Sequence, residues 1–493
     1  MDPLLDTLAR WKPFRALVVG DFMLDRQVSG DAERLSADAP VPVLHVRSII
    51  STPGGAANVC LDLAALRGSV RGFGICGDDE AGRTLAESLA AAGIDASCLL
   101  IDPSRPTTLK QNLIGLAQAR HPQKMFRLDH ESREPLSADI TDRLAAAIQA
   151  ALPDADVLCI EDYAKGVCSP ALCRRIIDAA ARLRVPVMVD PARGADFSKY
   201  AGATTMTPNR TEAELATGRT CDDAGDVAHN AILASTLRDS LRLEACVLTL
   251  DRHGALLLEQ GGQPISVPTI ARQVYDVTGA GDMFLAGLAA ARANHLSWLD
   301  SVRFANAAAG LEVEVFGVQP IPLERVHQAL MVQSRGVGGK ARSLDQALVE
   351  VAAVRQSGGR VVFTNGCFDV LHSGHVTLLE KAAAMGDFLV VGLNSDDSVR
   401  RLKGPSRPLN DQNDRARVLG ALEAVGCVVI FDQDTPFDLI RALRPDTLVK
   451  GGDYTKSTVV GASFVESYGG QVALVDLVQG QSTTGVIERM RSR

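Results

Sequence analysis

Short segments rich in β-branched residues alternate with Ala- and Leu-rich helical segments along most of the chain, and this alternation limits the possible fold more than any other feature. In the first part we expect strands at 16–20, 156–160, 186–190 and 245–250, with helices at 79–92, 170–184, 209–217 and 281–294. In the second part we expect strands at 360–365, 387–394, 427–431 and 446–450. The alternation predicts parallel α/β sheets, whose ligands bind at the carboxyl ends of the strands.

Two regions of the first part carry a different pattern. Residues from about 27 to 47 and from about 105 to 129 contain proline and two-residue alternation but no helical periodicity. We therefore expect a small separate sheet that covers the first domain.

The stretch 334–343, SRGVGGKARS, combines glycine, serine and basic residues without apolar periodicity, which favours a linker. It divides the 493 residues into an expected first domain at 1–333 and an expected second domain at 344–493. Each part is long enough to bury its own core.

Charge and cysteine usage exclude several classes of function. The chain has 51 Lys and Arg residues against 59 Asp and Glu residues, a net charge of −8, so we expect no nucleic-acid partner. The ten cysteines form no CxxC pair, which favours buried thiols in a reducing cytosol. The N-terminus lacks a signal-peptide pattern and no apolar run approaches 18 residues, so we expect a cytoplasmic protein without a membrane partner.

The motif DVTGAGD at 276–282 precedes a helical run and predicts an anion hole. Gly279, Ala280 and Gly281 let backbone N–H groups approach a ligand, and the helix N-terminus favours negative charge. Asp282 would repel an anion unless it takes a proton from an attacking hydroxyl while the amides stabilise a transferring phosphoryl group. The alternative is a glycine-rich turn with Asp282 as a helix cap.

This motif resembles the signature of the ribokinase-like (PfkB) sugar kinases, and other motifs agree in order over about residues 10–330. They are Gly20-Asp21, Asp25, the GGAAN run at 54–58, DYAKG at 162–166, Asp190-Pro191 and PNRTE at 208–212. One departure is Asp251, which stands where the family often has glycine, although Gly254 remains.

The resemblance implies roles for individual residues. Asp282 would be the base and Gly279–Gly281 the anion hole. The ATP-binding residues would be Asn209, Arg210, Thr211, Glu212, Asp251, Gly254, Asn306 and Lys165, although Lys165 fits a solvated lysine nearly as well. The sugar hydroxyls would be bound by Asp25, Gly54, Gly55 and Asn58. Mg²⁺ would arrive with ATP without direct protein ligands, with Glu212 acting through water, and a monovalent cation such as K⁺ is a further expectation.

Basic residues in the expected lid have two interpretations. Arg105 and Arg127 either clamp a phosphate already present on the sugar or belong to a solvated edge strand whose charges prevent pairing with another chain.

The motif GCFDVLHSGH at 366–375 follows a strand and precedes a helix. His372 and His375 are three residues apart at the helix entry, so both rings can face one ligand, and Gly374 allows close backbone approach. The alternatives are a zinc pair, for which no further ligands stand at metal spacing, or helix-capping histidines.

The second motif resembles the HxGH nucleotidyltransferases of the cytidylyltransferase branch, over about residues 345–493. The resemblance implies catalytic roles for His372 and His375. The implied nucleotide-binding residues are Thr364, Asn365, Phe368, Lys403, Arg415, Lys450, Ser482, Thr483 and Thr484. Asp369 is expected to orient its loop. A phosphate monoester is already ionised at neutral pH, so its attack on an α-phosphate needs cations and donors and no protein base.

The fold class expected from both resemblances is α/β: a ribokinase-like αβα domain with a small β lid, followed by a Rossmann-like nucleotidyltransferase domain. The order of motifs, with APVPV at 39–43 and VKGGDY at 449–454, resembles the bifunctional heptose kinase/adenylyltransferases of lipopolysaccharide core synthesis. That resemblance implies ATP, heptose 7-phosphate and heptose 1-phosphate as partners, ADP-heptose as product, and a homodimer. Two alternatives stay open: a cytidylyltransferase that makes another nucleotide-linked sugar or polyol, and a sugar-sensing scaffold with a degenerate kinase domain.

Overall fold

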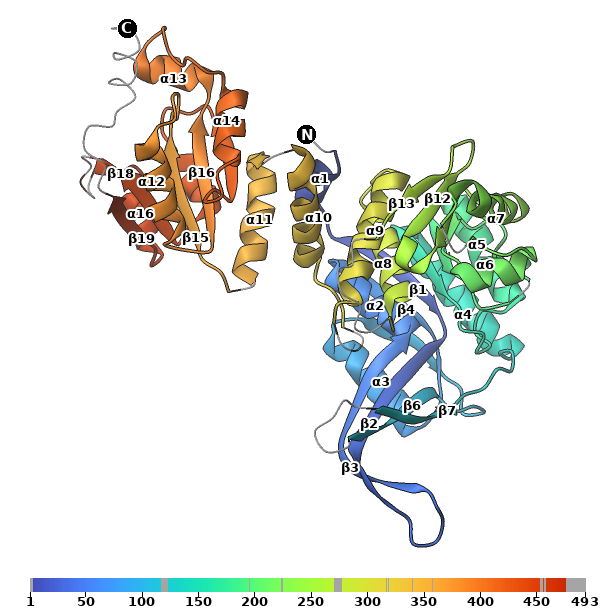
Figure 1. Ribbon diagram of the computed structural model, residues 1–493. Helices are drawn as coiled ribbons and strands as arrows, with labels where there is room; N and C mark the ends of the chain where they lie inside the picture. The colour runs from blue at the N-terminus through green and yellow to red at the C-terminus, as the bar shows by residue number, and fades with distance from the viewer. Residues whose placement is uncertain are drawn as a thin grey trace. The chain divides into compact units, whose positions relative to one another are not determined.

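The computed structural model describes residues 3–475 except 117–122, 195, 223–224, 270–276, 316, 318, 339, 357, 453–454 and 456–457. The chain forms two compact units (Figure 1). One unit is Lys12–Val326, and the other combines Met1–Trp11 with His327–Arg493.

The first unit is built on a nine-stranded sheet in the order β13-β12-β11-β10-β9-β8-β1-β4-β5, parallel except at β12 and β13. Its strands are β1 (Phe14–Gly20), β4 (Gly68–Cys76), β5 (Asp95–Ile101), β8 (Val157–Glu161), β9 (Val187–Asp190), β10 (Thr205–Met206), β11 (Ala245–Thr249), β12 (Ala255–Glu259) and β13 (Ile265–Val267). The predicted alternation of strands and helices is confirmed.

Helices cover both faces of this sheet (Figure 1). On one face lie α2 (Ala56–Ala65), α8 (Ala280–Ala293) and α9 (Trp298–Glu312). On the other face lie α4 (Ala138–Ala151), α5 (Pro170–Leu183), α6 (Arg210–Thr217) and α7 (Val227–Leu241). Because both faces are covered, the central strands β1 and β8 are apolar almost throughout rather than alternating.

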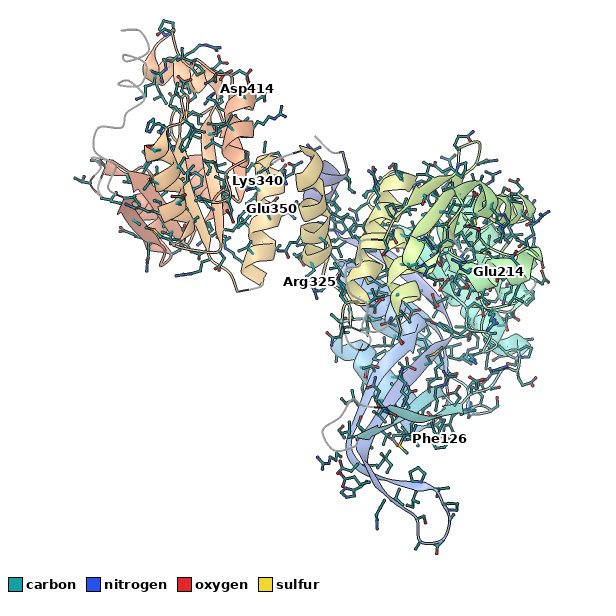
Figure 2. All side chains as sticks on the ribbon, viewed as in Figure 1. Phe126, Glu214, Arg325, Lys340, Glu350 and Asp414 are labelled. Carbon is teal, nitrogen blue, oxygen red and sulfur yellow. The ribbon has the colours of Figure 1, made fainter. Side chains whose placement is uncertain are left out.

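A second, four-stranded sheet forms the lid of this unit, in the order β3-β2-β6-β7. Its strands are β2 (Phe22–Leu35), β3 (Pro42–Gly55), β6 (Thr108–Leu116) and β7 (Gln123–His130). It confirms the separate sheet expected from the sequence, with β2 starting directly after the end of β1. The hairpin β2–β3 extends beyond the other two strands in Figure 1, and Phe126 on β7 lies 63% exposed (Figure 2).

The second unit has a six-stranded parallel sheet in the order β14-β17-β16-β15-β18-β19. Its strands are β14 (Ala341–Arg342), β15 (Val361–Gly366), β16 (Phe388–Asn394), β17 (Cys427–Phe431), β18 (Thr447–Gly451) and β19 (Gln471–Val475). Strand order reverses between β15 and β18, and such a switch point is where parallel α/β sheets bind ligands.

Helices lie on both sides of the sheet of this unit (Figure 1). They are α11 (Leu344–Gln356), α12 (Ser373–Ala383), α13 (Asp396–Lys403), α14 (Gln412–Gly420), α15 (Phe437–Leu443) and α16 (Ala462–Ser467). The N-terminal α1 (Pro3–Ala9) packs on α11, and Trp11 meets His327 edge to face at 5.9 Å.

The segment that the sequence favours as a linker contains regular structure at both ends. Helix α10 (Leu323–Gly338) continues into it, and Arg342 of β14 is buried in an ion pair with Glu350 of α11, labelled in Figure 2. The domain boundaries at 333 and 344 stay a prediction.

Within the described ranges, no helix has both the length and the apolar character needed to cross a bilayer.

Candidate active sites

The carboxyl ends of three adjacent strands bring acidic residues together in the first unit. Gly20 of β1, Glu161 of β8 and Asp190 of β9 are aligned in register. Asp282 lies in the first turn of α8, and its carboxylate has oxygens within 4.8 Å of those of Glu161 and Asp190. A parallel sheet explains this convergence, because the predicted sites at separate strand ends share one edge.

Asp282 is 5% exposed and accepts two hydrogen bonds. Asn58 Nδ2 donates to Oδ2 at 2.9 Å, and the Tyr163 hydroxyl donates to Oδ1 at 2.9 Å. Desolvation raises the pKa of Asp282 to about 6, and both hydrogen bonds oppose that rise because they favour the carboxylate. A carboxylate with this pKa is mostly ionised at neutral pH and able to accept a proton.

Gly279 forms the N-terminal cap of α8, three residues before Asp282. Its φ of 89° lies in the left-handed region that favours glycine. A Cβ at this position would lie 2.6 Å from Glu312 Oε1, so no larger residue fits without movement. The predicted anion hole therefore stands at a helix N-terminus close to the candidate base, where the Ala280 N–H makes one long bond, 3.4 Å, to the carbonyl of Val277.

Tyr163 was not among the predicted site residues. The sequence carried a signal for it, because it is the second residue of the DYAKG motif that follows β8. Its contact with Asp282 joins positions 119 residues apart, and no local pattern predicts such a pairing.

Asp21 fixes the loop that carries Tyr163. Its buried carboxylate accepts backbone N–H bonds from Tyr163 and Lys165, both at 2.9 Å, and from Val167 at 3.3 Å. Desolvation raises the pKa of Asp21 to about 6, and the three N–H donors oppose that rise.

Two of the predicted sugar-binding residues, Asn58 and Asp25, lie close enough to act on Asp282. Asn58 contacts Asp282 directly, and a Cβ on Gly54 would stand 2.4 Å from Asp25 Oδ2, so this glycine is in close contact with Asp25. Gly55 caps α2 with a φ of 55°. Burial raises the pKa of Asp25, and the nearby positive charge of Lys110 opposes it.

The two predicted lid arginines differ in their surroundings. Arg127 on β7 is exposed and pairs with Asp129 at 2.8 Å. Arg105 lies before β6 and is buried, with its guanidinium bound to Asp102 and to the carbonyls of Lys165 and Pro135. These contacts give Arg105 a structural environment, and a phosphate-clamping role for either arginine stays a prediction.

Lys165 is largely buried and pairs with Glu131 at 2.5 Å. It lines a small cavity with Arg105 and Ser132 near the carboxyl end of β1. The ion pair explains why the side chain is not solvated, and its predicted contact with ATP phosphates stays untested.

The predicted ATP-binding residues lie at the start of α6 and around β11–β13. Asn209 and Glu212 form a capping box, with Asn209 Oδ1 accepting from Glu212 N–H at 3.0 Å and Glu212 Oε2 accepting from Asn209 N–H at 2.8 Å. Glu212 also faces Asp190, whose pKa is raised by burial and then by this neighbouring carboxylate.

The remaining residues of this group have structural contacts. Arg210 lies 3.6 Å from Asp251, and Thr211 is exposed. Gly254 has a φ of 81° and stands against the carbonyl of Val267. Asn306 donates to the carbonyls of Val267 and Pro268, both at 2.9 Å, and so anchors the end of β13.

The acidic cluster fits a divalent cation. Glu161 is 1% exposed, and its Oε2 has no hydrogen-bond partner among the described residues. Carboxylate oxygens are the ligands that Mg²⁺ takes, usually together with substrate phosphates and water.

The histidine pair of the second unit stands at the switch point of its sheet. His372 caps α12, and the rings of His372 and His375 stack at 3.9 Å. Phe368, buried beneath them, meets His375 edge to face at 5.2 Å. Desolvation lowers the pKa of His375 to about 4 and also lowers that of His372, so both rings are neutral at pH 7.

Neither histidine caps the helix with its side chain, and the buried Nδ1 atom of each ring has no partner among the residues described. Neutral imidazoles with a free nitrogen can bind a ligand at the helix N-terminus.

Lys450 reaches this site from the end of β18. Its Nζ donates to the carbonyl of Asn365 at 3.2 Å, and burial lowers its pKa to about 8. Thr364 is fully buried, with its hydroxyl bound to the carbonyl of Val449. Lys403 is exposed at the end of α13. Its positive charge opposes the rise that burial causes in the pKa of Cys367, which lies in the loop 367–372 between β15 and α12, here called the histidine loop.

Among the residues that the structure describes, Arg415 has the largest fully buried side chain. It donates to the carbonyls of Cys367, Asn394 and Asn410 and to Asp396 Oδ1. The guanidinium thus holds the histidine loop in place through the carbonyl of Cys367. Its predicted contact with the nucleotide is not tested, and the predicted Ser482, Thr483 and Thr484 lie outside the described residues.

Asp369 orients its loop, as expected from the sequence. Its carboxylate accepts from Leu409 N–H at 2.6 Å and Asn410 N–H at 3.2 Å and pairs with Arg407. It ties the segment after α13 to the histidine loop.

Both parts of the chain match families of known proteins. A sequence model of the pfkB family carbohydrate kinases matches residues 14–325, and a cytidylyltransferase-like model matches residues 363–481. The Bifunctional protein HldE of Trichlorobacter lovleyi is 42% identical over 98% of this chain and 97% of that protein. The Methylobacillus flagellatus protein of the same name is 46% identical over 97% of each chain. The chain belongs to the HldE family.

Solved structures agree with the fold of the kinase half of this HldE family member. Arabidopsis thaliana ribokinase, complexed with ribose and ATP, has a TM-score of 0.51 at 22% identity, over 65% of this chain and 99% of its own. Escherichia coli phosphofructokinase-2 with fructose-6-phosphate has a TM-score of 0.54 at 18% identity, over 65% of this chain and 100% of its own. The protein is a bifunctional enzyme that joins a carbohydrate kinase to a nucleotidyltransferase.

Proposed function

We propose that the first unit phosphorylates the anomeric hydroxyl of D-glycero-β-D-manno-heptose 7-phosphate and that the second unit transfers AMP from ATP to heptose 1-phosphate. The products would be ADP-heptose and pyrophosphate, for the lipopolysaccharide core, with a separate phosphatase acting between the steps. The observation that carries this proposal is one chain with a buried base at an anion hole and a neutral histidine pair at a second helix N-terminus.

In the kinase step, Asp282 accepts the proton of the sugar hydroxyl as that oxygen attacks the γ-phosphorus of ATP. The backbone N–H groups of 279–281 stabilise charge on the transferring group, and ADP leaves. Asn58, which donates to Asp282, and Asp25, which is in close contact with Gly54, would orient the sugar.

Mg²⁺ that arrives with ATP would neutralise phosphate charge. Glu212 and Asp190 face one another and would hold the ion through water, and Glu161 offers a further oxygen. A K⁺ ion in the kinase unit is part of the same proposal.

In the transfer step, the 1-phosphate of the sugar attacks the α-phosphorus of ATP without a protein base. His372 and His375 would donate to the α-phosphate, and Lys450 would supply the cation that stabilises charge as pyrophosphate leaves.

We also propose a homodimer in the cytoplasm, where ATP is available. Ile49, Phe126 and Leu128 are 60%, 63% and 45% exposed on one face of the lid sheet. An apolar face of this kind marks an interaction surface. Light scattering would show a mass of twice 52.3 kDa.

Product analysis tests the proposed reactions. Mass spectrometry of heptose 7-phosphate with ATP should show the 1,7-bisphosphate, and adding the phosphatase should give ADP-heptose. A product formed from CTP and not from ATP would favour the cytidylyltransferase alternative, and no ADP release at all would favour the scaffold.

A further inference from the structure

The first unit contains a large cavity that neither proposed reaction uses. Its volume is about 780 Å³, which lies within the range of small-molecule sites. The cavity lies at the amino ends of β8, β9, β10 and β11, and its lining includes the residues directly before these strands, Asp156, Pro186, Thr204 and Glu244. The acidic cluster lies at the carboxyl ends, so the cavity is at the opposite edge of the same sheet.

The ends of three helices place basic side chains around this cavity. Arg184 is the C-cap of α5, Arg242 is the C-cap of α7, and His295 follows the C-cap of α8. Arg292 adds another basic side chain from the last turn of α8. The carbonyl ends of helices repel an anion, so the guanidinium groups are what would attract one here.

The three residues at the helix ends have a backbone conformation that favours glycine. The φ angles are 59° at Arg184, 57° at Arg242 and 61° at His295. Eight non-glycine residues have a positive φ in the described part of the chain, and three of them line this one cavity. Glycine or asparagine is usual at such helix ends, because a Cβ is strained there. Strained residues gather at functional sites, so the clustering points to a ligand.

The arginines are available to a ligand. Arg184 and Arg242 are exposed, and neither has an ion-pair partner among the residues that the structure describes. Arg292 is already oriented: its Cζ stands 4.2 Å from the centroid of the Trp298 ring, and its Nη1 donates to the carbonyl of Leu296. Its Nε is buried without a partner in the described ranges. A guanidinium held in this way loses little freedom when it binds a phosphate.

The rest of the lining fits the organic part of a phosphate ester. Asp156 and Glu244 carry carboxylates that can accept hydrogen bonds from hydroxyl or amino groups. Asp156 also accepts the N–H of Arg15 at 2.7 Å, which fixes its position. The apolar side chains of the lining include Leu152, Pro153, Leu183 and Val185. Charges of both signs beside apolar carbon suit a larger molecule than an inorganic anion.

We propose that this cavity binds a phosphate ester whose organic part carries hydroxyl or amino groups. The phosphate would be bound by Arg184, Arg242 and Arg292. Hydroxyl or amino groups of the organic part would donate to Asp156 and Glu244. A nucleotide and a sugar phosphate share this chemistry, and the experiment distinguishes them.

Tryptophan fluorescence provides the test, because the chain has only two tryptophans. Trp298 contacts the guanidinium of Arg292, which lines the cavity, whereas Trp11 belongs to the other unit. In the full chain with Trp11→Phe, the emission of Trp298 reports on the cavity. The probes are ADP, glucose 6-phosphate and inorganic phosphate.

We expect a saturable change in emission with ADP or with glucose 6-phosphate, at a Kd at least about tenfold below that of inorganic phosphate. A response to ADP alone would identify a nucleotide site, and a response to glucose 6-phosphate alone would identify a sugar phosphate site. No saturable change with either ester would overturn the proposal. An equal Kd for inorganic phosphate would also overturn it, because the cavity would then bind an adventitious ion only.

The decisive variant combines Arg184→Gly and Arg242→Gly in the Trp11→Phe background. Glycine relieves the strained backbone while both charges are lost, so this variant should melt no lower than its parent. The Kd of the ester should rise about tenfold or more. If the glycine variant melts lower, Arg184→Gln with Arg242→Gln removes the charges and keeps the side-chain stems.

The matched control is Arg182→Gln. Arg182 is exposed in the last turn of the same helix, α5, but does not line the cavity, so this variant should keep the Kd of its parent. A change in emission that keeps its Kd when Arg184 and Arg242 are both replaced would come from binding elsewhere and would overturn the proposal. Both enzymatic activities should keep their kcat in these variants, which separates this site from the proposed function.

Discussion

The two active sites use the same place in an α/β sheet with opposite electrostatics. The kinase site gathers Glu161, Asp190 and Asp282 at the carboxyl ends of its strands, and the transferase site gathers His372, His375 and Lys450 at the ends of its own. The nucleophiles explain the difference. A sugar hydroxyl must lose a proton to attack, whereas a phosphate monoester is already ionised.

Burial therefore shifts the pKa values in the two sites in opposite directions, because it disfavours the charged form of acids and bases alike. In the kinase unit it raises the pKa of Asp282 to about 6, which leaves a carboxylate that can accept a proton near neutral pH. In the transferase site it lowers the pKa of His375 to about 4 and that of Lys450 to about 8, which leaves neutral donors and a titratable cation. Both folds place side chains at the carboxyl ends of parallel strands. Local desolvation then sets the pKa of those side chains and thereby the chemistry that they can perform.

The largest expected effect is loss of the base. Asp282→Asn should lower sugar phosphorylation about 10²–10⁴-fold or more, because only the carboxylate can take the proton. Adenylyl transfer to added heptose 1-phosphate should stay at the wild-type rate, and calorimetry should show sugar and ATP binding largely retained. Turnover near normal would rule out Asp282 as the base; the alternative that it caps α8 is already excluded, because Gly279 is the cap.

The corresponding change in the other half is His375→Ala. Formation of the nucleotide sugar should fall about 10²–10³-fold, because the donor stabilises charge that grows at the α-phosphate. ADP release from the kinase step, measured by a coupled assay, should be unaffected. A large loss of ADP release in His375→Ala would mean that the two sites are not independent.

The two activities should be lost on opposite sides of neutral pH: adenylyl transfer at alkaline pH and sugar phosphorylation at acidic pH. Lys450 carries its charge below its pKa of about 8, so kcat/KM for adenylyl transfer should fall as pH rises through that value. The kinase should instead lose activity as pH falls through about 6, where Asp282 becomes protonated.

Lys450→Arg is the matched variant for this comparison. Arginine keeps its charge, so the ratio of kcat/KM at pH 9 to that at pH 7 should rise about tenfold over the wild-type ratio. An unchanged alkaline limb would assign the titration to another group.

The smallest effect is expected from the lid. Arg127→Ala should raise KM for the phosphorylated sugar a few-fold, since an exposed charge-assisted contact is lost, with kcat nearly constant. Arg105→Ala should do the same if it clamps the phosphate. Its buried pairing with Asp102 also predicts a loss of about 3–5 kcal/mol of stability, measurable by denaturant unfolding. Equal KM values in both variants and wild type would assign the two arginines to structure alone.

Much of the architecture could be predicted from the sequence. The apolar runs that became β1, β8 and β9, and the proline-containing segments that became the lid, have local signatures of strands. Asp282 and His375 were identifiable because their motifs place glycine and a helix N-terminus beside a reactive side chain.

Other features had no local signature. The sequence favoured a linker at 334–343, but α10 continues into this segment and Arg342 is buried there, because a partner, Glu350, lies on the neighbouring helix. The contacts of Arg415 with three carbonyls and Asp396 likewise join distant parts of the chain, and its expected contact with the nucleotide stays a prediction.

The sequence by itself determined the order of the two α/β units, the strand ends that carry the sites, and the residue types available for chemistry. These follow from local periodicity and from glycine at helix entries. Only the tertiary structure decided which groups act on one another: the Tyr163 hydroxyl on Asp282, Asp21 on the loop that holds Tyr163, and Lys110 on the same ring. The reason is physical, because hydrogen bonds and pKa shifts depend on distance and burial, and these contacts join residues that lie far apart in the chain.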